Sequence, residues 1–208
     1  MNKVLRRTIY LLFLVIFSHH TYAQCGYDFS RTITIDNTQV SGSNHLTDFP
    51  VLVTLTLPDL ATVANGGVVQ NTSGYDIRFR ASDCDCWLDH QIESYDAITG
   101  AYTAWVRIPQ LKFDEDTEIE MYYGNASISI DPSTDKTWTN DYVGVWHLSD
   151  DPQSSGPQHI DASGTGNNGT AEGGGSIVNV QGIAGNAVSF DGNNDLIEVP
   201  DDNTLDLT

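Results

Sequence analysis

The stretch Val51-Leu52-Val53-Thr54-Leu55-Thr56-Leu57 decides the fold, and Pro58 follows it directly. Every second residue from Val51 to Leu57 is apolar, and threonine fills two of the three positions between them. Successive side chains of a β-strand point to opposite faces of the sheet, so this alternation predicts a strand with one buried face. Proline has no N–H for the ladder, and Pro58 therefore marks the end of the strand.

The same period of two recurs along the chain, at residues 31–35, 75–80, 118–123, 187–190 and 196–199. In the second of these, Asp76, Arg78 and Arg80 alternate with apolar residues, so the three charges are expected on the outer face. Turn-forming pairs such as Asn65-Gly66 separate the strands, and no stretch has the apolar spacing of an amphipathic helix. The sequence predicts an all-β protein whose first domain is an antiparallel β-sandwich of the jelly-roll type.

The N-terminus has the three parts of a secretory signal peptide. Lys3, Arg6 and Arg7 precede an apolar run at 9–17, and Thr21-Tyr22-Ala23 then offers small residues where a signal peptidase reads. The run is shorter than the roughly 20 apolar residues that span a bilayer. We expect cleavage after Ala23 and a protein without a membrane span that is secreted or held at the cell surface, with an uncleaved anchor as the alternative.

Acidic side chains dominate the charge, with 28 Asp and Glu against 9 Lys and Arg. Loss of the signal peptide removes three of the basic residues, which leaves 6 against 28 and a net charge of −22. Nucleic acids bind through clustered Lys and Arg, so this composition excludes them as partners. Two interpretations of the acidic surface stay open, solubility through self-repulsion and capture of calcium.

Three cysteines follow the signal peptide, Cys25, Cys84 and Cys86. An exported protein can form disulfides, but a bond between Cys84 and Cys86 would close a small strained ring around Asp85. A bridge from Cys25 to Cys84 or Cys86 is therefore expected, and the remaining thiol is free or paired with another chain. The neighbouring cysteines have no matching second pair, which speaks against a zinc site.

Composition changes near Ser149, where a stretch rich in Gly, Asn, Asp and Ser runs to Ser176. Strand patterns resume after it, which indicates a second domain with a long early loop. The predicted organisation is a signal peptide at 1–23, a β-sandwich domain at 24–130, a linker at 131–144 and the start of a second domain at 145–208. A sandwich needs more strands than this last stretch provides, so further domains are expected downstream of Thr208.

Residues from about Cys25 to Asn125 resemble domain-of-unknown-function family 2341, which occurs in exported multidomain bacterial proteins. The segments that carry the resemblance are Asp48–Val53, Tyr75–Phe79, Gln91–Asp96, Trp105–Pro109 and Met121–Asn125. Cys84-Asp85-Cys86 departs from the family pattern, which has a simpler turn there. The resemblance implies secretion and modular company, but no activity.

The region from Val145 onward resembles the opening of a laminin-G or concanavalin-A-like domain. The resemblance rests on Val145–Leu148, Asp161–Thr170, Gly185–Gly192 with Asp195, and Val199-Pro200. It implies a second, truncated β-sandwich of a kind that commonly binds sugars or proteins, often with structural calcium.

A catalytic interpretation of Asp76, Arg78, Glu93 and Arg107 starts from their place on strand-like segments. Paired carboxylates suit glycoside hydrolysis, but neighbouring arginines lower a carboxyl pKa and favour a row of cross-strand salt bridges. The sequence has no nucleophile elbow, zinc-protease motif or phosphate loop. We therefore predict no catalytic residues and no enzyme activity for this stretch.

Aromatic side chains suit carbohydrate, because sugar rings stack their C–H faces on them. Trp105 shares strand parity with Arg107, and Tyr122 shares it with Glu118 and Glu120, which would place an aromatic beside charge on an outer face. We predict Trp105, Tyr122 and Arg107 as ligand-binding residues. The alternative is that these aromatics, with Trp87, Trp138 and Trp146, fill cores or cover sheet edges.

Asp161, Asp191 and Asp195 lie among Gly and Asn residues, whose tight turns can aim backbone carbonyls inward. Calcium takes 6–8 oxygen ligands, so these three are the candidates for a structural calcium site, and no other cofactor is expected. The alternative is that they form plain hairpin turns.

The leading prediction is a non-catalytic exported module of a larger bacterial surface or secreted protein, which binds a glycan or a surface protein. One alternative is an accessory region that targets a secreted glycoside hydrolase. Another is a periplasmic sensory or structural domain of an envelope complex.

Overall fold

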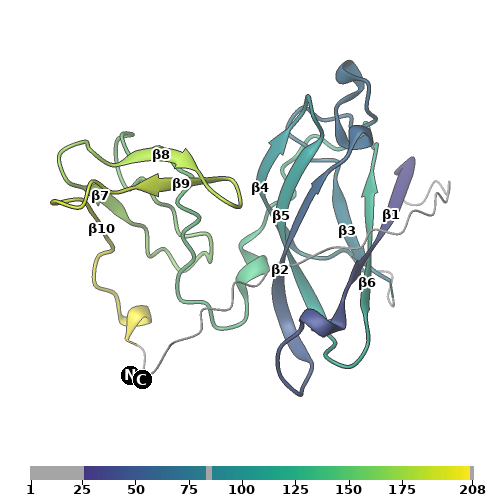
Figure 1. Ribbon diagram of the computed structural model, residues 1–208, viewed down its shortest axis with the longest axis horizontal. Helices are drawn as coiled ribbons and strands as arrows, with labels where there is room; N and C mark the ends of the chain where they lie inside the picture. The colour runs from purple at the N-terminus through teal and green to yellow at the C-terminus, as the bar shows by residue number, and fades with distance from the viewer. Residues whose placement is uncertain (1–25, 83–85, 207–208) are drawn as a thin grey trace, which may run out of the picture.

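The computed structural model describes residues 26–82 and 86–206. Within them the chain forms ten strands and five short 3-10 helices, and every paired strand is antiparallel to its neighbours, which confirms the predicted all-β class. Figure 1 shows two groups of strands, a larger sandwich and a smaller group beside it.

Two three-stranded sheets form the sandwich. One has the order β1 (Phe29–Ile35), β6 (Thr117–Tyr123) and β3 (Arg78–Ala81), and the other has the order β2 (Leu46–Thr56), β5 (Ala101–Leu111) and β4 (His90–Asp96). The stretch that decides the fold forms most of the second half of β2. It pairs with β5 so that Val51 lies opposite Val106 and Leu55 opposite Tyr102.

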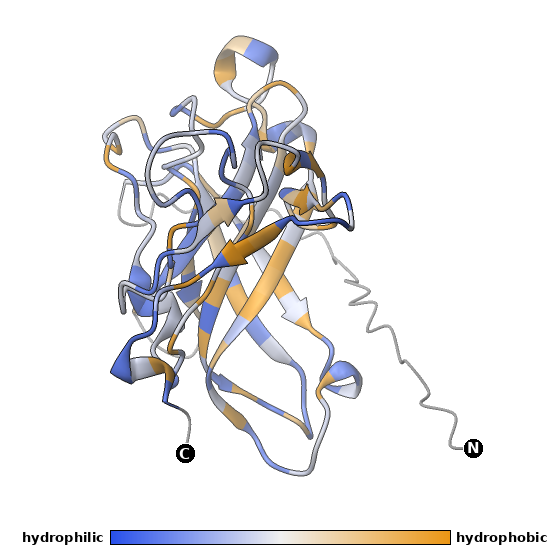
Figure 2. Cartoon of the chain, turned by 90° about the vertical axis from the view of Figure 1, so that its left-hand side faces the viewer, coloured by the Kyte–Doolittle hydropathy of each residue, from blue (hydrophilic) through white to orange (hydrophobic). Residues whose placement is uncertain are grey.

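The core lies between the two sheets. β2 contributes Val51, Val53 and Leu55, which are at most 7% exposed, and the facing sheet contributes Ile33 and Ile119 among others. Burying a large aliphatic side chain stabilises a fold by about 1.5–3 kcal/mol. Because these positions alternate along each strand, orange apolar segments alternate with white and blue ones on the long strands (Figure 2).

The segment at 75–80 departs from the prediction. β3 begins at Arg78, so Asp76 lies before the strand and is fully buried instead of on the outer face. Its carboxylate accepts hydrogen bonds of 2.9–3.2 Å from the backbone N–H groups of residues 70, 71, 124 and 125. Asp76 thus joins the loop before β3 to the end of β6, a contact between distant segments that alternation within one strand does not reveal.

The smaller group consists of two two-stranded antiparallel ladders. β7 (Thr170–Glu172) pairs with β10 (Leu196–Glu198), and β8 (Val178–Gln181) pairs with β9 (Asn186–Ser189). β9 and β10 lie where the period-two pattern at 187–190 and 196–199 predicted strands. Unlike the sandwich strands, none of the four contains a buried residue, and Ile177, just before β8, is the buried apolar neighbour.

The segment at 131–144, expected to be a linker, lies against the sandwich. It contains η4 (Asp135–Trp138), which contacts β4 and β5, and the Thr134 side chain caps it by accepting from the Lys136 N–H. The other 3-10 helices are η1 (Asn37–Gln39), η2 (Pro58–Leu60), η3 (Val63–Asn65) and η5 (Asn203–Leu205). In the part of the chain that the structure describes, no helix has the length and apolar character to cross a membrane.

Candidate functional site

Trp105 and Arg107 lie on the outer face of the β2–β5–β4 sheet. Between and before them in β5, Val106 and Ala104 belong to the core, so the two side chains share the opposite face, as strand parity predicts. The structure therefore places this tryptophan beside this arginine.

A β-bulge in β4 turns Glu93 toward the same side. Gln91 lies opposite Trp105, and the register shifts between Ile92 and Ser94, which leaves Glu93 as the extra residue. Bulges re-aim side chains and occur often next to functional sites. Here the bulge brings Glu93 into contact with the segment that follows η4.

Gln91 connects that segment to the sheet. Its Oε1 accepts a 2.8 Å hydrogen bond from Trp138 Nε1 and lies 2.9 Å from His147 Nε2. An amide oxygen only accepts, so His147 Nε2 must donate. The Trp138 ring, 5% exposed, also packs on Trp105 and Tyr142 with ring centroids 5.3 and 5.5 Å apart. Such aromatic pairs contribute about 0.5–1.5 kcal/mol each.

Glu93 and His147 form a shielded ion pair. His147 Nδ1 lies 2.7 Å from Glu93 Oε2, close but without the alignment of a hydrogen bond, and the two side chains are 18% and 2% exposed for His147 and Glu93. Both imidazole nitrogens thus face side-chain oxygens of β4. The pair joins the segment that follows η4 to β4.

A cleft of about 440 Å³ opens between the sheet and this segment. Trp146 forms part of its wall, where Nε1 donates to the Asn167 carbonyl at 2.7 Å. Its ring lies against Gly144, where a Cβ would come within 2.3 Å of Trp146 Cη2. The volume falls in the range of about 300–1,000 Å³ that is usual for ligand sites. The cleft is lined by Phe49, Pro50, Glu93, Trp105, Trp138, Tyr142, Gly144, Val145, Trp146, His147 and Ala184.

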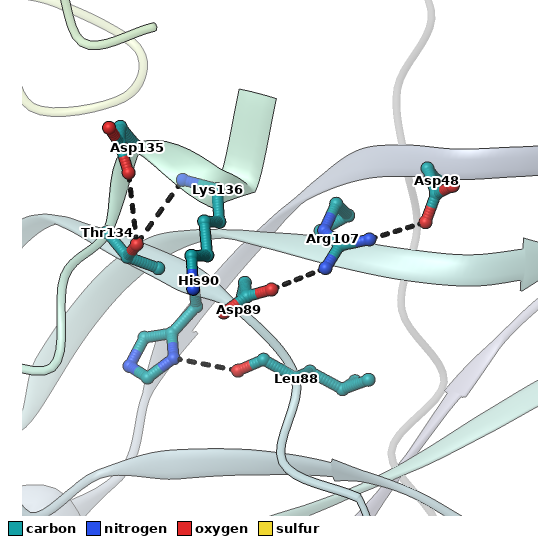
Figure 3. A network of polar contacts seen from close by, with 8 residues as sticks. All are labelled: Asp48, Leu88, Asp89, His90, Arg107, Thr134, Asp135 and Lys136. Atoms are coloured by element: carbon teal, nitrogen blue, oxygen red, sulfur yellow. Dashed lines mark hydrogen bonds and ion pairs between the residues drawn. The ribbon is translucent and has the colours of Figure 1, made fainter. Parts of the chain in front are cut away.

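Arg107 forms ion pairs with two carboxylates of the protein itself (Figure 3). Its Nη1 donates to Asp48 Oδ1 at 2.5 Å and its Nη2 to Asp89 Oδ2. Asp48 has a φ of 49°, in the left-handed region that aspartate tolerates better than most residues. Burial alone would lower the pKa of Arg107, but the hydrogen bonds to Asp89 and Asp48 raise it above its ordinary value. The guanidinium therefore joins the start of β2 to the segment just before β4.

The prediction that Asp76, Arg78, Glu93 and Arg107 form a row of cross-strand salt bridges is wrong. The Asp76 carboxylate accepts from backbone amides. Glu93 pairs with His147 instead of an arginine. Arg107 pairs with Asp48 and Asp89. The guanidinium of Arg78 instead lies 5.4 Å from the centre of the Trp87 ring. Tertiary neighbours, which no strand pattern specifies, replace the expected partners.

Tyr122 lies on the outer face of the opposite sheet. It is 6% exposed and packs on Tyr27 and Trp87, with ring centroids 5.9 and 5.6 Å apart. Of the three predicted ligand residues, the structure therefore brings Trp105 and Arg107 together and places Tyr122 in a separate aromatic cluster.

Asp161 lies at the centre of a hydrogen-bonded loop. It is 5% exposed and its carboxylate oxygens accept bonds of 2.7–3.1 Å. Burial alone would raise its pKa, but bonds from Ser163, Thr165 and the Val145 N–H lower it below its ordinary value. The donors are the backbone N–H groups of residues 145, 163, 166 and 167 and the hydroxyls of residues 163 and 165.

The other two calcium candidates lie together at the turn before β10. Asp195 Oδ2 accepts from the Asp191 N–H at 2.7 Å, and its Oδ1 accepts from the Ser176 hydroxyl. Within residues 26–82 and 86–206, no three or more His, Cys, Asp or Glu side chains are grouped to hold a metal ion. The structure thus does not gather Asp161, Asp191 and Asp195 into one such group.

The predicted disulfide involves residues outside the described part of the chain. Cys25 and Cys84 both fall there. Cys86 is disulfide-bonded, and the chain has no fourth cysteine. The bridge from Cys25 to Cys84 or Cys86 stays a prediction.

Comparison with known proteins bears on the stretch that holds the cleft. Residues 73–155 match the family Domain of unknown function (DUF2341). This confirms the first resemblance, although the DUF2341 match begins well after residue 25 and extends beyond Asn125. Glu93, Trp105, Trp138 and His147 all fall inside it. No curated protein and no solved structure matches the chain.

Sequence reasoning missed the pairing of Glu93 with His147. It placed Glu93 among arginines and gave His147 no role, because the two are far apart in the sequence and neither stands in a recognisable motif. The available signal was compositional, since His147 directly follows Trp146 in a segment with two other aromatics, Trp138 and Tyr142.

Proposed function

We propose that the cleft binds carbohydrate and that the chain is a non-catalytic module of an exported bacterial surface or secreted protein. The observation that carries this is the wall of the cleft, where Trp105, Trp138, Tyr142 and Trp146 surround a space of about 440 Å³. Aromatic faces pack against the C–H patches of sugar rings, and a few placed polar groups then orient the ring. Glu93 supplies such a polar group.

The residues of this cleft suit ligand binding better than catalysis. Glycoside hydrolysis ordinarily needs two carboxyl groups on either side of the scissile bond. Among the described residues that line the cleft, Glu93 is the acidic one, and His147 already contacts its Oε2. A module of this kind is equally suited to stand alone in an adhesin or to direct an attached hydrolase to its substrate.

Export and a surface location belong to the same proposal. They are supported by the signal-peptide pattern of residues 1–23, which lies outside the described residues, and by an acidic composition with a net charge of −19. The resemblance of the region from Val145 to laminin-G and concanavalin-A-like domains adds a second reason to expect a sugar or protein ligand. Structural calcium enters the proposal through that resemblance.

A glycan array probed with the purified chain tests the proposal, followed by titration calorimetry on any glycan that binds. We expect Trp105→Ala and Tyr142→Ala each to weaken binding about tenfold, equivalent to about 1.4 kcal/mol. Trp87→Ala is the matched control, because this tryptophan lies in the aromatic cluster with Tyr122 on the other sheet. Absence of binding to any glycan by a folded chain, or equal loss in the Trp87 variant, would refute the proposal.

A further inference from the structure

We infer that the sugar bound in the cleft is an amino sugar, and that the ammonium group on its C2 carbon donates to Glu93 Oε1. The inference rests on the proposed carbohydrate-binding function and specifies its ligand class. Its starting point is a polar atom that the fold leaves unmet: Oε1 is buried and has no hydrogen-bond partner in the structure.

An unpartnered carboxylate oxygen at a cleft points to a donor supplied from outside the protein. Buried polar atoms almost always find a partner, and a charged group left without one is especially costly. The Glu93 side chain is 2% exposed, and the residue lines the cleft beside Trp105 and Trp138. A carboxylate can accept on both oxygens, and His147 engages Oε2 alone.

The turn between β8 and β9 covers this oxygen without bonding to it. A Cβ at Gly185, whose φ is +74°, would lie 3.0 Å from Glu93 Oε1. Ala184 in the same turn lines the cleft, and Ile183 beside it is fully exposed. In Figure 1 this turn reaches from the smaller group toward β4. The turn thus packs closely on one side of Oε1 without supplying a donor, and the cleft is the side from which a ligand's donor would come.

Three features favour an ammonium over a neutral hydroxyl as that donor. The faces of Trp105, Trp138 and Trp146 carry the negative side of the ring quadrupole, which attracts cations. The chain has a net charge of −19, which raises the local concentration of cationic ligands. An ammonium also has three donors and no acceptor, so it matches a cleft whose acidic group only accepts.

Three disaccharides that differ at the C2 substituents separate the possibilities: the β-1,4-linked dimer of glucosamine, that of N-acetylglucosamine, and cellobiose. Each is titrated calorimetrically into the purified chain at low and moderate salt. We expect the glucosamine dimer to bind at least tenfold more tightly than the other two, and to lose affinity with salt. Equal affinities, or tightest binding of the acetylated dimer, would overturn the inference while the proposed carbohydrate function stands. Binding of none of them in a chain that binds another glycan would likewise overturn only the inference. A chain that binds no glycan at all would end both.

Glu93→Gln keeps the shape of the side chain and removes its charge, so it should abolish the preference for the glucosamine dimer over cellobiose. Glu118→Gln, an exposed acid on the opposite sheet, removes the same charge from the surface and controls for non-specific attraction. Equal effects of the two variants would show that Glu93 makes no specific contact. If Glu93→Gln does not fold, Gly185→Val tests the same contact, because a larger side chain over Oε1 should block the glucosamine dimer selectively.

Discussion

Replacing His147 with alanine would strand the Glu93 carboxylate inside the protein. The Glu93 side chain is 2% exposed, and His147 Nδ1, at 2.7 Å, is its ion-pair partner. The change also takes one of two donors from Gln91 Oε1, which keeps its 2.8 Å bond from Trp138. The perturbation therefore acts mainly on one buried charge.

The expected cost is about 3 kcal/mol. Removing one partner of a buried ion pair typically destabilises by about 3–5 kcal/mol. The lower end applies here, because His147 is 18% exposed and alanine would let water approach the carboxylate. In the double variant with Glu93→Gln no carboxylate is stranded, so its cost should fall below the sum of the single variants by about 2 kcal/mol.

Urea unfolding followed by tryptophan fluorescence is the appropriate assay, since Trp105 and Trp138 lie next to the pair and report on the junction directly. With a slope of about 1.5–3 kcal/mol per molar urea, a loss of about 3 kcal/mol moves the midpoint down by about 1–2 M. Far-ultraviolet circular dichroism on the same samples shows whether the strands unfold with the junction. A change under 0.5 kcal/mol for His147→Ala, together with additivity in the double variant, would refute the view that the pair is shielded and stabilising.

Two further predictions concern a buried group in each half of the protein. Burial lowers the pKa of His90 to about 4 from 6.5, and its Nδ1 lies 3.3 Å from the Leu88 carbonyl (Figure 3). The unfolded chain therefore takes up a proton on this ring below pH 6.5 that the folded chain does not. Stability should fall by about 3 kcal/mol between pH 6.5 and pH 4 and change no further through this group at lower pH. Denaturation measured across that range should show a flatter dependence for His90→Phe, and identical pH profiles would contradict the assignment. In the second half, Asp161→Ala leaves its donors without an acceptor, and hydrogen bonds to a charged group contribute about 1.5–3 kcal/mol each. Hydrogen exchange of the Gly166 and Asn167 amides should accelerate at least tenfold while the sandwich core is unchanged, and unaltered protection would show that the loop does not depend on the carboxylate.

Strand periodicity predicted the features that depend on residues near each other in the sequence, namely where strands lie and which face of each strand is buried. The alternation at 51–57 places the buried face of β2 correctly, and the parity of Trp105 with Arg107 puts both on one outer face. It failed for Asp76, whose partners are backbone groups of a loop and of the end of β6. Pairing partners that lie far apart in the chain are set by how the sheets and loops pack, and a short sequence window contains no record of them.

The candidate cleft could not be predicted for the same reason, because segments far apart in the sequence form it together. The outer face of a sandwich sheet is ordinarily open to solvent, and Trp105 alone would be an exposed ring on a flat surface. The segment at 131–148 crosses that face and makes it concave, by setting Trp138 on Trp105 and tying itself to Gln91.

The fixed conformation of residues 146–148 gives the wall of the cleft its shape. Leu148 has a φ of 59°, a left-handed conformation that costs a residue of this type about 1–2 kcal/mol. Strain of this kind persists only where the surroundings enforce it, and here the bond from Trp146 to Asn167 and the pair of His147 with Glu93 do so. A wall held rigid before the ligand arrives loses little freedom on binding, which favours affinity. The strained backbone beside the ion pair therefore fits the proposal that this wall forms part of a preformed binding site.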